Sequence, residues 1–405
     1  MRNSFKDRIL RVIDTLAEWC VYVLIFAVTF SNSIVEIVST IMIVAWIAGI
    51  VLRKDLKKLF FPAALILGAY FVWVLLSCFN SAYPSQSLRG IFKALQYLLI
   101  FLAVATQGWT TAKMKRFVYF AAGAVVLAGA NGIVQYVTGT DLIRQRTLIP
   151  EDHLRRISSS FIHPNDFGAY LVVMASLFVS MLLLKKNTLK QSGLFLIGLI
   201  VSVACLFLTG SRGAWMFFGA AFMTVGILKG RKAAAIFIMI LSAVFFLMPS
   251  ETRERIYETV DFESGTAWER VMIWRGSVDM IKEHPVLGFG VNTFSKHFPD
   301  YKPEGYPDDR YAHNCYLQMA SEIGIVGAVF FMMFIIAALF SSLKGILRLP
   351  DGQRKGLAIG LFGGSVGFAL NSAVDTHLFS LALAVFFNII LGFTMVSSGY
   401  FKDEK

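Results

Sequence analysis

Two arginines stand beside long apolar runs of this chain. Arg212 lies in the tight break Thr209-Gly-Ser-Arg-Gly213 between two short runs, and Arg270 borders an apolar stripe further along. A guanidinium at membrane depth is costly unless it faces a cavity and meets an anion, and its planar fork offers paired donors to two phosphate oxygens. Arg212 is therefore a candidate phosphate ligand, although an arginine that snorkels to close a helical hairpin would stand at the same place.

The neighbouring Arg275 borders the same stripe as Arg270. The spacing does not choose between these two cations, and a solvated amphipathic face would account for both. Four more arginines precede the sixth apolar run and are candidates for recruiting anionic headgroups: Arg144, Arg146, Arg155 and Arg156.

Histidines stand at the edges of apolar runs. His313, in Ala312-His-Asn314-Cys315, directly precedes one run, and His163, followed by Pro164 and Asn165, precedes another. Histidine changes charge near neutral pH and can act as a general base, so His313 is a candidate base and a purely structural histidine is the alternative. Asn314 and Asn165 are candidate substrate ligands, or caps that satisfy free N–H groups at helix starts. His377, in Asp375-Thr-His377, is a weaker candidate.

The elements that position these residues follow from composition. Of 405 residues, 56% are hydrophobic and 16% are charged, whereas soluble proteins have about 25% charged residues. A span needs about 20 apolar residues, which predicts an all-α integral membrane protein with about twelve spans. These are 16–32, 34–52, 59–79, 90–108, 117–137, 165–184, 192–208, 213–228, 233–248, 315–340, 356–374 and 381–398.

The distribution of positive charge predicts the topology. The termini and every second gap between these segments hold 23 of the 38 lysines and arginines. Positive charge collects in cytoplasmic loops, so we expect a multi-pass protein with both termini in the cytoplasm. The net charge of +12 then reports topology and does not indicate a nucleic-acid partner.

The long gap before the tenth segment divides the chain into residues 1–248, a loop over 249–314, and residues 315–405. Within this loop a capping box at Thr266 and Glu269 predicts a helix that Pro285 ends, followed by a turn at Gly288-Phe-Gly290. The helix is expected to lie against the membrane or the bundle through four apolar residues, Val271, Trp274, Val278 and Ile281.

The remaining charged residues and the cysteines do not indicate a further functional site. Glu36 and Lys93 fall within predicted spans, where either an ion pair or snorkelling would account for them. The four scattered cysteines are expected to be free thiols, and no ligand spacing for a metal and no nucleotide motif occurs in the sequence. We therefore expect neither a metal nor another cofactor.

Four segments resemble the O-antigen ligase/polymerase superfamily of bacterial envelope enzymes. They are Phe161-Ile-His-Pro-Asn-Asp-Phe-Gly168, Thr209-Gly-Ser-Arg-Gly213, Arg270-Val-Met-Ile-Trp274 with His284-Pro-Val-Leu-Gly-Phe-Gly290, and His313-Asn-Cys-Tyr-Leu-Gln-Met-Ala-Ser-Glu-Ile-Gly324. The resemblance spans roughly residues 15–400 and implies a GT-C-like membrane glycosyltransferase, in which Arg212, Arg270 and His313 match the essential residues of the family.

The resemblance also implies the reaction. The donor would be a glycan on undecaprenyl pyrophosphate at the periplasmic face of the bacterial inner membrane, and in ligases the acceptor is the lipid A–core of lipopolysaccharide. A ligase is favoured by the long late loop followed by His313-Asn314. Polymerases and protein O-oligosaccharyltransferases of the same superfamily are alternatives, and a transporter of lipid-linked glycans is the alternative from another class.

Overall fold

A computed structural model describes residues 2–151, 154–184, 187–247, 253–254, 265–303 and 311–400. Each of the twelve predicted segments coincides with a helix. The helices are α1 (Arg2–Phe30), α2 (Asn32–Arg53), α3 (Pro62–Ser77), α4 (Pro84–Thr106), α5 (Thr111–Thr138), α6 (Pro164–Leu182), α7 (Leu189–Leu208), α8 (Arg212–Lys229), α9 (Arg231–Leu247), α13 (Cys315–Arg348), α14 (Gln353–Asn371) and α15 (Leu381–Ser397).

Eight of these helices are long and apolar enough to cross a membrane: α1 to α7 and α13. This confirms an all-α membrane protein. The full count of twelve spans and the GT-C-like likeness stay predictions, because α8, α9, α14 and α15 do not meet that criterion over the described residues.

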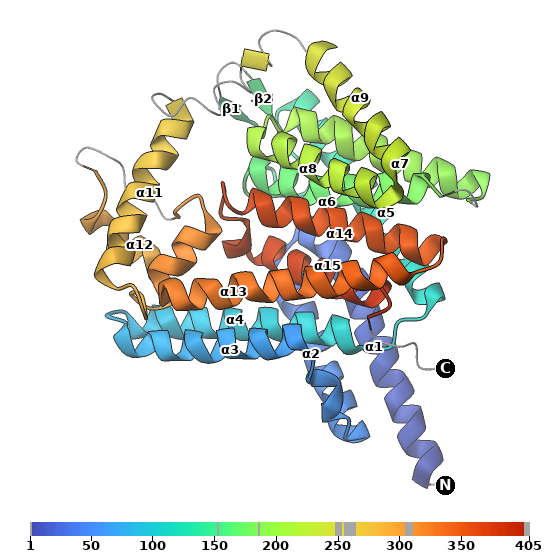
Figure 1. Cartoon of the computed structure of the whole chain (residues 1–405), viewed down its shortest axis with the longest axis horizontal. Helices are drawn as coiled ribbons and strands as arrows, with labels where there is room; N and C mark the ends of the chain where they lie inside the picture. Colours follow the sequence, from blue (N-terminus) through green and yellow to red (C-terminus); the bar gives the residue numbers. More distant parts are fainter. Residues whose placement is uncertain are drawn as a thin grey trace.

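The helices form one bundle in which neighbours along the chain are often not neighbours in space. Figure 1 shows α3 and α4 side by side beneath α13 and α15, while α6, α7 and α8 lie on the other side of α14. Both termini lie at one end of the bundle, away from α11 (Gly265–Glu283) and α12 (Phe294–His297). We call the end that carries α11 and α12 the loop end, and the opposite end the terminal end.

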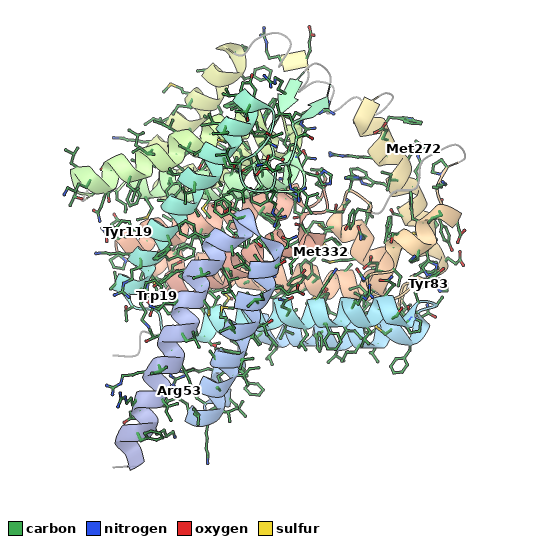
Figure 2. The ribbon with its side chains drawn as sticks, turned by 180° about the vertical axis from the view of Figure 1, so that it is seen from behind. Trp19, Arg53, Tyr83, Tyr119, Met272 and Met332 are labelled. Carbon is green, nitrogen blue, oxygen red and sulfur yellow. The ribbon has the colours of Figure 1, made fainter. Side chains whose placement is uncertain are left out.

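Ion pairs at the terminal end join segments predicted to share one side of the membrane. The Glu18 carboxylate of α1 forms ion pairs with Lys113 at 3.1 Å and with Arg116 at 3.2 Å. Asp14 pairs with Arg53 of α2 (Figure 2). The proposed Glu36–Lys93 ion pair is wrong, because both side chains are exposed and no ion pair joins them among the described residues.

The loop end holds elements that the sequence did not predict. A short antiparallel hairpin of β1 (Ile149–Glu151) and β2 (Leu154–Arg156) precedes α6. Short 3-10 turns, η4 (Phe298–Asp300) and η5 (His377–Phe379), follow α12 and precede α15.

The predicted loop helix is present as α11, and it ends two residues before Pro285. Its buried face was predicted only in part, because Ile281 packs against the main core and Trp274 contacts the Ala312 carbonyl, but the most buried side chains are others. The side chains that pack inward are Ile273, Ser277 and Met280, while Val278 is exposed. The reason is that Phe289, Phe294 and Phe298 form a small core with Ile273 and Met280. The face of α11 that packs there is shifted by one or two residues from the predicted face. The Thr266 side chain, and with it the predicted cap, lies outside the described side chains.

Helix α13 is broken near its start. Gly324 has φ +73° and interrupts the helix after Glu322, and in Figure 1 the helix changes direction sharply at its α12 end. A Cβ at Gly324 would lie 1.8 Å from the Val286 carbonyl oxygen, so only glycine fits. The predicted turn at Gly288 and Gly290 packs there, and the Gly290 N–H donates to the Glu322 carbonyl at 2.8 Å.

Candidate active site

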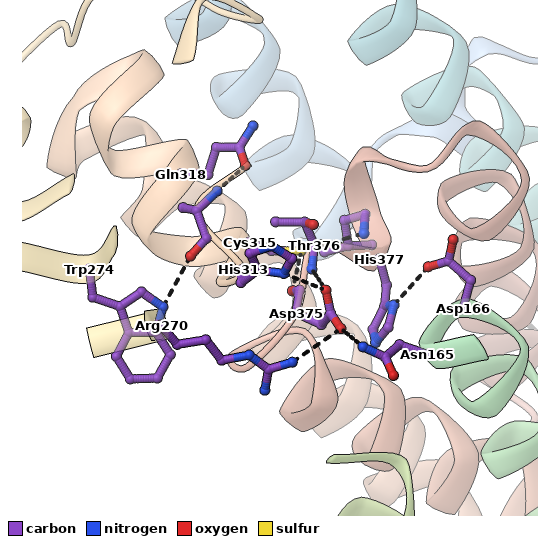
Figure 3. Close-up of polar contacts among 12 residues, drawn as sticks. Asn165, Asp166, Arg270, Trp274, His313, Cys315, Gln318, Asp375, Thr376 and His377 are labelled. Carbon is purple, nitrogen blue, oxygen red and sulfur yellow. Dashed lines mark hydrogen bonds and ion pairs between the residues drawn. The ribbon is translucent and has the colours of Figure 1, made fainter. Parts of the chain in front are cut away.

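A carboxylate joins four segments of the chain at the loop end (Figure 3). Asp375 lies in the turn between α14 and η5 and is 9% exposed. Its Oδ1 lies 3.3 Å from His313 Nδ1, and its Oδ2 lies 3.7 Å from a guanidinium nitrogen of Arg270. Asn165 Nδ2 donates to Oδ2 at 2.7 Å. Asn165 and His313, which are 148 positions apart in sequence, are thereby brought with Arg270 to one buried anion.

The environment keeps this carboxylate ionised. Burial alone would raise the pKa of Asp375, but the hydrogen bond from His313 and the charges of His377 and Arg270 hold that pKa well below its usual range. The Thr376 N–H adds a donor to Oδ1 at 2.8 Å. An ionised carboxylate only accepts hydrogen bonds, so the His313 Nδ1 that faces it carries a proton.

His313 is held by its backbone as well as by its ring. It has φ +47°, a left-handed conformation that is uncommon for residues other than glycine. On its two sides, the Ala312 N–H donates to Gln318 at 3.1 Å, and Asn314 accepts from the N–H groups of Tyr316 and Leu317 as the cap of α13. The structure thus gives Asn314 a capping role, and its predicted contact with substrate stays a prediction.

The two arginines of α11, Arg270 and Arg275, lie on different faces of the helix. Arg270 faces Asp375, whereas Arg275 is exposed. Five residues along a helix turn a side chain by about 140°, which accounts for their separation. Trp274, one turn after Arg270, donates from Nε1 to the Ala312 carbonyl at 3.1 Å and so fastens α11 to the segment that carries His313.

Arg156 is buried, with 8% of its surface exposed. Its Nη2 donates to Asn165 Oδ1 at 2.7 Å, and its Nε donates to the Thr209 carbonyl at 2.8 Å. It therefore braces Asn165 against the turn that precedes α8. A direct contact of Arg156 with substrate, which the sequence predicted, stays a prediction.

Arg212 is the first residue of α8, after the cap Ser211. The glycines on either side of it, Gly210 and Gly213, lie close to Arg156 and to the turn that holds Asp375. A Cβ on Gly210 would lie 3.1 Å from Arg156 Cγ, and a Cβ on Gly213 would lie 3.2 Å from a methyl group of Val374, the residue before Asp375. Arg212 is half-buried. The positive end of the α8 dipole lies at the same place, which favours a bound anion.

A second acid–histidine pair lies beside the first. His377 is fully buried, and its Nδ1 lies 3.1 Å from Asp166 Oδ1. His163 is exposed and stands at the cap position of α6 without a side-chain capping bond. Of the segment 161–168, the side chains of Asn165 and Asp166 therefore reach these acid–histidine pairs, whereas no described side-chain contact joins His163 to them.

Sequence reasoning missed Asp375 and Asp166. Both are single acids next to apolar helices, and their partners lie 62 and 211 residues away, so no local spacing reveals them. The one available signal was Asp375-Thr-His377, a polar turn between two apolar runs. Over the described residues no group of three or more His, Cys, Asp or Glu side chains suits a metal ion. The four cysteines are free thiols, as predicted.

A family model described as O-Antigen ligase matches residues 197–332. No curated protein matches this chain. The matched part contains Arg212, Arg270 and His313, whereas Asn165 and Asp375 lie outside it. Over residues 197–332 the family match confirms the predicted resemblance to the O-antigen ligase/polymerase superfamily, whereas the first resembling segment, residues 161–168, lies outside the match.

Proposed function

We propose that this chain is an O-antigen ligase. It would transfer a glycan from undecaprenyl pyrophosphate to the lipid A–core of lipopolysaccharide at the periplasmic face of the bacterial inner membrane, without a metal. The observation that carries the proposal is the contact of Asp375 with both His313 and Arg270, because it joins a candidate base to a candidate phosphate ligand.

His313 would act as the base. Because its Nδ1 proton faces Asp375, its Nε2 is left with the lone pair that can accept a proton. The hydroxyl of the acceptor sugar loses its proton to Nε2 as its oxygen attacks the anomeric carbon. Asp375 then faces an imidazolium and stabilises it. Direct attack by the acceptor inverts the anomeric centre.

Arg270 and Arg212 would act on the leaving group. As the new glycosidic bond forms, the bond from the anomeric carbon to the phosphate oxygen breaks, and negative charge accumulates on the pyrophosphate. Guanidinium groups aimed at that charge stabilise the transition state. Arg270 touches Asp375 through one nitrogen at 3.7 Å, and a guanidinium has five N–H donors, so it retains donors for phosphate.

The test is transfer by the purified protein. Lipid-linked O-antigen and lipid A–core are mixed in detergent with the wild-type protein or with His313→Ala, Arg270→Ala or Arg212→Ala. We expect transfer by the wild-type protein alone, at unchanged yield of folded protein. Transfer by all three variants would refute the site assignment.

The same assay separates the alternatives. Elongation of one lipid-linked glycan on another, without lipid A–core, would identify a polymerase. Transfer to a protein acceptor would identify a protein O-oligosaccharyltransferase. Movement of the donor across vesicles without any transfer would identify a transporter, which needs no base.

A further inference from the structure

A cavity lies between α3, α4, α13 and α15, and the space within it, part of which is open to solvent, is ≈ 860 Å³. Its lining mixes apolar side chains such as Leu67 and Phe331 with the polar side chains of Lys93, Tyr70 and Tyr97. The helices that form it are those seen packed together around α13 in Figure 1. It is separate from the side chains that contact Asp375.

Three polar side chains of this cavity have no protein partner. Among the described residues, Tyr70, Tyr97 and Lys93 form no hydrogen bond and no ion pair. Tyr70 is only 9% exposed. Tyr97 lies 13 residues into α4, about 20 Å from its start. Lys93 is exposed and Tyr97 is half-buried. Because a buried polar group without a partner costs free energy, the two tyrosine hydroxyls indicate a ligand with hydrogen-bond acceptors.

The cavity shares a wall with the candidate active site. Tyr311 lines it two residues before His313, and Leu378 lines it three residues after Asp375. The Leu378 N–H donates to Cys315 Sγ, whose thiol donates to the Asp375 carbonyl at 3.2 Å. The cavity therefore adjoins the segments that carry the imidazole and the carboxylate.

The lining favours an anionic head. Glu322 also lines the cavity, but its carboxylate already accepts from the N–H groups of Asn292 and Phe294 and from the Gln318 amide. Its carboxylate oxygens are thus engaged by protein donors, whereas the exposed Lys93 ammonium forms no ion pair among the described residues and can meet an anionic ligand. A purely hydrocarbon chain would leave both tyrosine hydroxyls unsatisfied.

We propose that this cavity seats the acceptor, as the negatively charged, sugar-bearing head of a glycolipid, on the side of His313 away from the arginines. This inference rests on the proposed function. The pyrophosphate of the donor then meets Arg212 and Arg270, while the acceptor head meets Lys93, Tyr70 and Tyr97. The apolar side chains between them, including Leu67 and Phe331, contact the lipid part of the acceptor.

The first test is kinetic. Lys93→Gln should raise the KM for lipid A–core about tenfold, the effect of losing one charge-assisted hydrogen bond, and leave the KM for the lipid-linked donor within twofold. Arg89→Gln is the matched control, because Arg89 is exposed one turn earlier on α4 and does not line the cavity. A rise in the donor KM instead, or an equal effect of both variants, would overturn the proposal.

The second test is binding, in the His313→Ala background so that no transfer is needed. Retention of lipid A–core by the purified protein, measured by native mass spectrometry, should fall about tenfold with Lys93→Gln and severalfold with Tyr97→Phe. Unchanged retention in both variants overturns the cavity assignment. If the wild-type protein transfers nothing, the proposed function fails, whereas loss of retention in these variants still supports the cavity.

Discussion

Replacing Asp375 by asparagine removes a charge and almost no volume. The amide oxygen can still accept from His313 Nδ1, so the ring orientation is retained. What is lost is the attraction between the carboxylate and the imidazolium that forms as the acceptor hydroxyl is deprotonated. We therefore expect Asp375→Asn to lower kcat and to change the KM values little.

The magnitude follows from the distance. Two unit charges 3.3 Å apart interact by about 5 kcal/mol at an effective dielectric constant near 20. The His313 side chain is 34% exposed, so solvent screens part of this energy, and we take about half. A loss of about 2.5 kcal/mol corresponds to a decrease in kcat of roughly 70-fold.

The variant has a side effect that the structure also predicts. Arg156 donates to Asn165 Oδ1, which holds the Asn165 amide nitrogen toward Asp375. In Asp375→Asn two amide nitrogens can face each other, at a cost of about 1 to 3 kcal/mol in stability. The double variant Asp375→Asn with Asn165→Asp restores a donor–acceptor pair there and should recover the melting temperature.

The assay is single-turnover transfer from lipid-linked glycan to lipid A–core, with melting temperature measured on the same preparations. The double variant should stay slow, because its carboxylate no longer contacts His313. Asp166→Asn serves as the control for the neighbouring acid–histidine pair and should retain more activity than Asp375→Asn. Wild-type kcat in Asp375→Asn, or recovery of kcat in the double variant, would refute the reasoning.

Three further predictions concern charge, pH and backbone. Arg270→Gln should reduce transfer at least about 100-fold, since losing one oxyanion-stabilising donor has this effect, while the exposed Arg275→Gln should stay within threefold; equal losses would argue against the assignment. Because the pKa of Asp375 is depressed by folding, its ionised form stabilises the protein above the usual aspartate range and this stabilisation disappears as the pH falls toward the lower folded value. The difference in melting temperature between the wild type and Asp375→Asn should thus be constant from pH 7 to about pH 5 and shrink only below about pH 4, and a difference that shrinks already near neutral pH would contradict it. Gly324→Ala should destabilise by at least about 3 kcal/mol, because its Cβ would overlap the Val286 carbonyl at positive φ, whereas Gly68→Ala in α3, which has open space, should be neutral or stabilising in thermal unfolding.

The helices were predictable because a chain segment in lipid must satisfy its own backbone hydrogen bonds. A run of about 20 apolar residues must satisfy its backbone internally, so α2 and α6 were expected within two residues of their observed bounds. The face of α11 was not predictable in the same way. Ile273 and Met280 face inward because the phenylalanines of residues 289–298 pack there, and that contact depends on tertiary structure.

Some residues of the candidate site were predictable from the sequence, and others depend on tertiary contacts. Arg212, Arg270 and His313 stand out in the sequence because charge beside an apolar run needs a reason. Asp375 does not stand out, since acids are ordinary in turns, and it becomes informative only when the bundle brings Asn165 and Arg270 to it. The Glu36–Lys93 pair failed for the same reason, because shared depth in the membrane does not make two side chains neighbours.

The break at Gly324 determines where the N-terminal segment of α13 places His313. The eight residues from Cys315 to Glu322 form a helical segment about 12 Å long that leaves the line of α13. If α13 ran straight, this segment would continue along the axis of α13 instead of turning away from it. The kink returns the imidazole to the turn that holds Asp375. In the proposed reaction, the position of the imidazole relative to the sugar therefore depends on a single residue without a side chain.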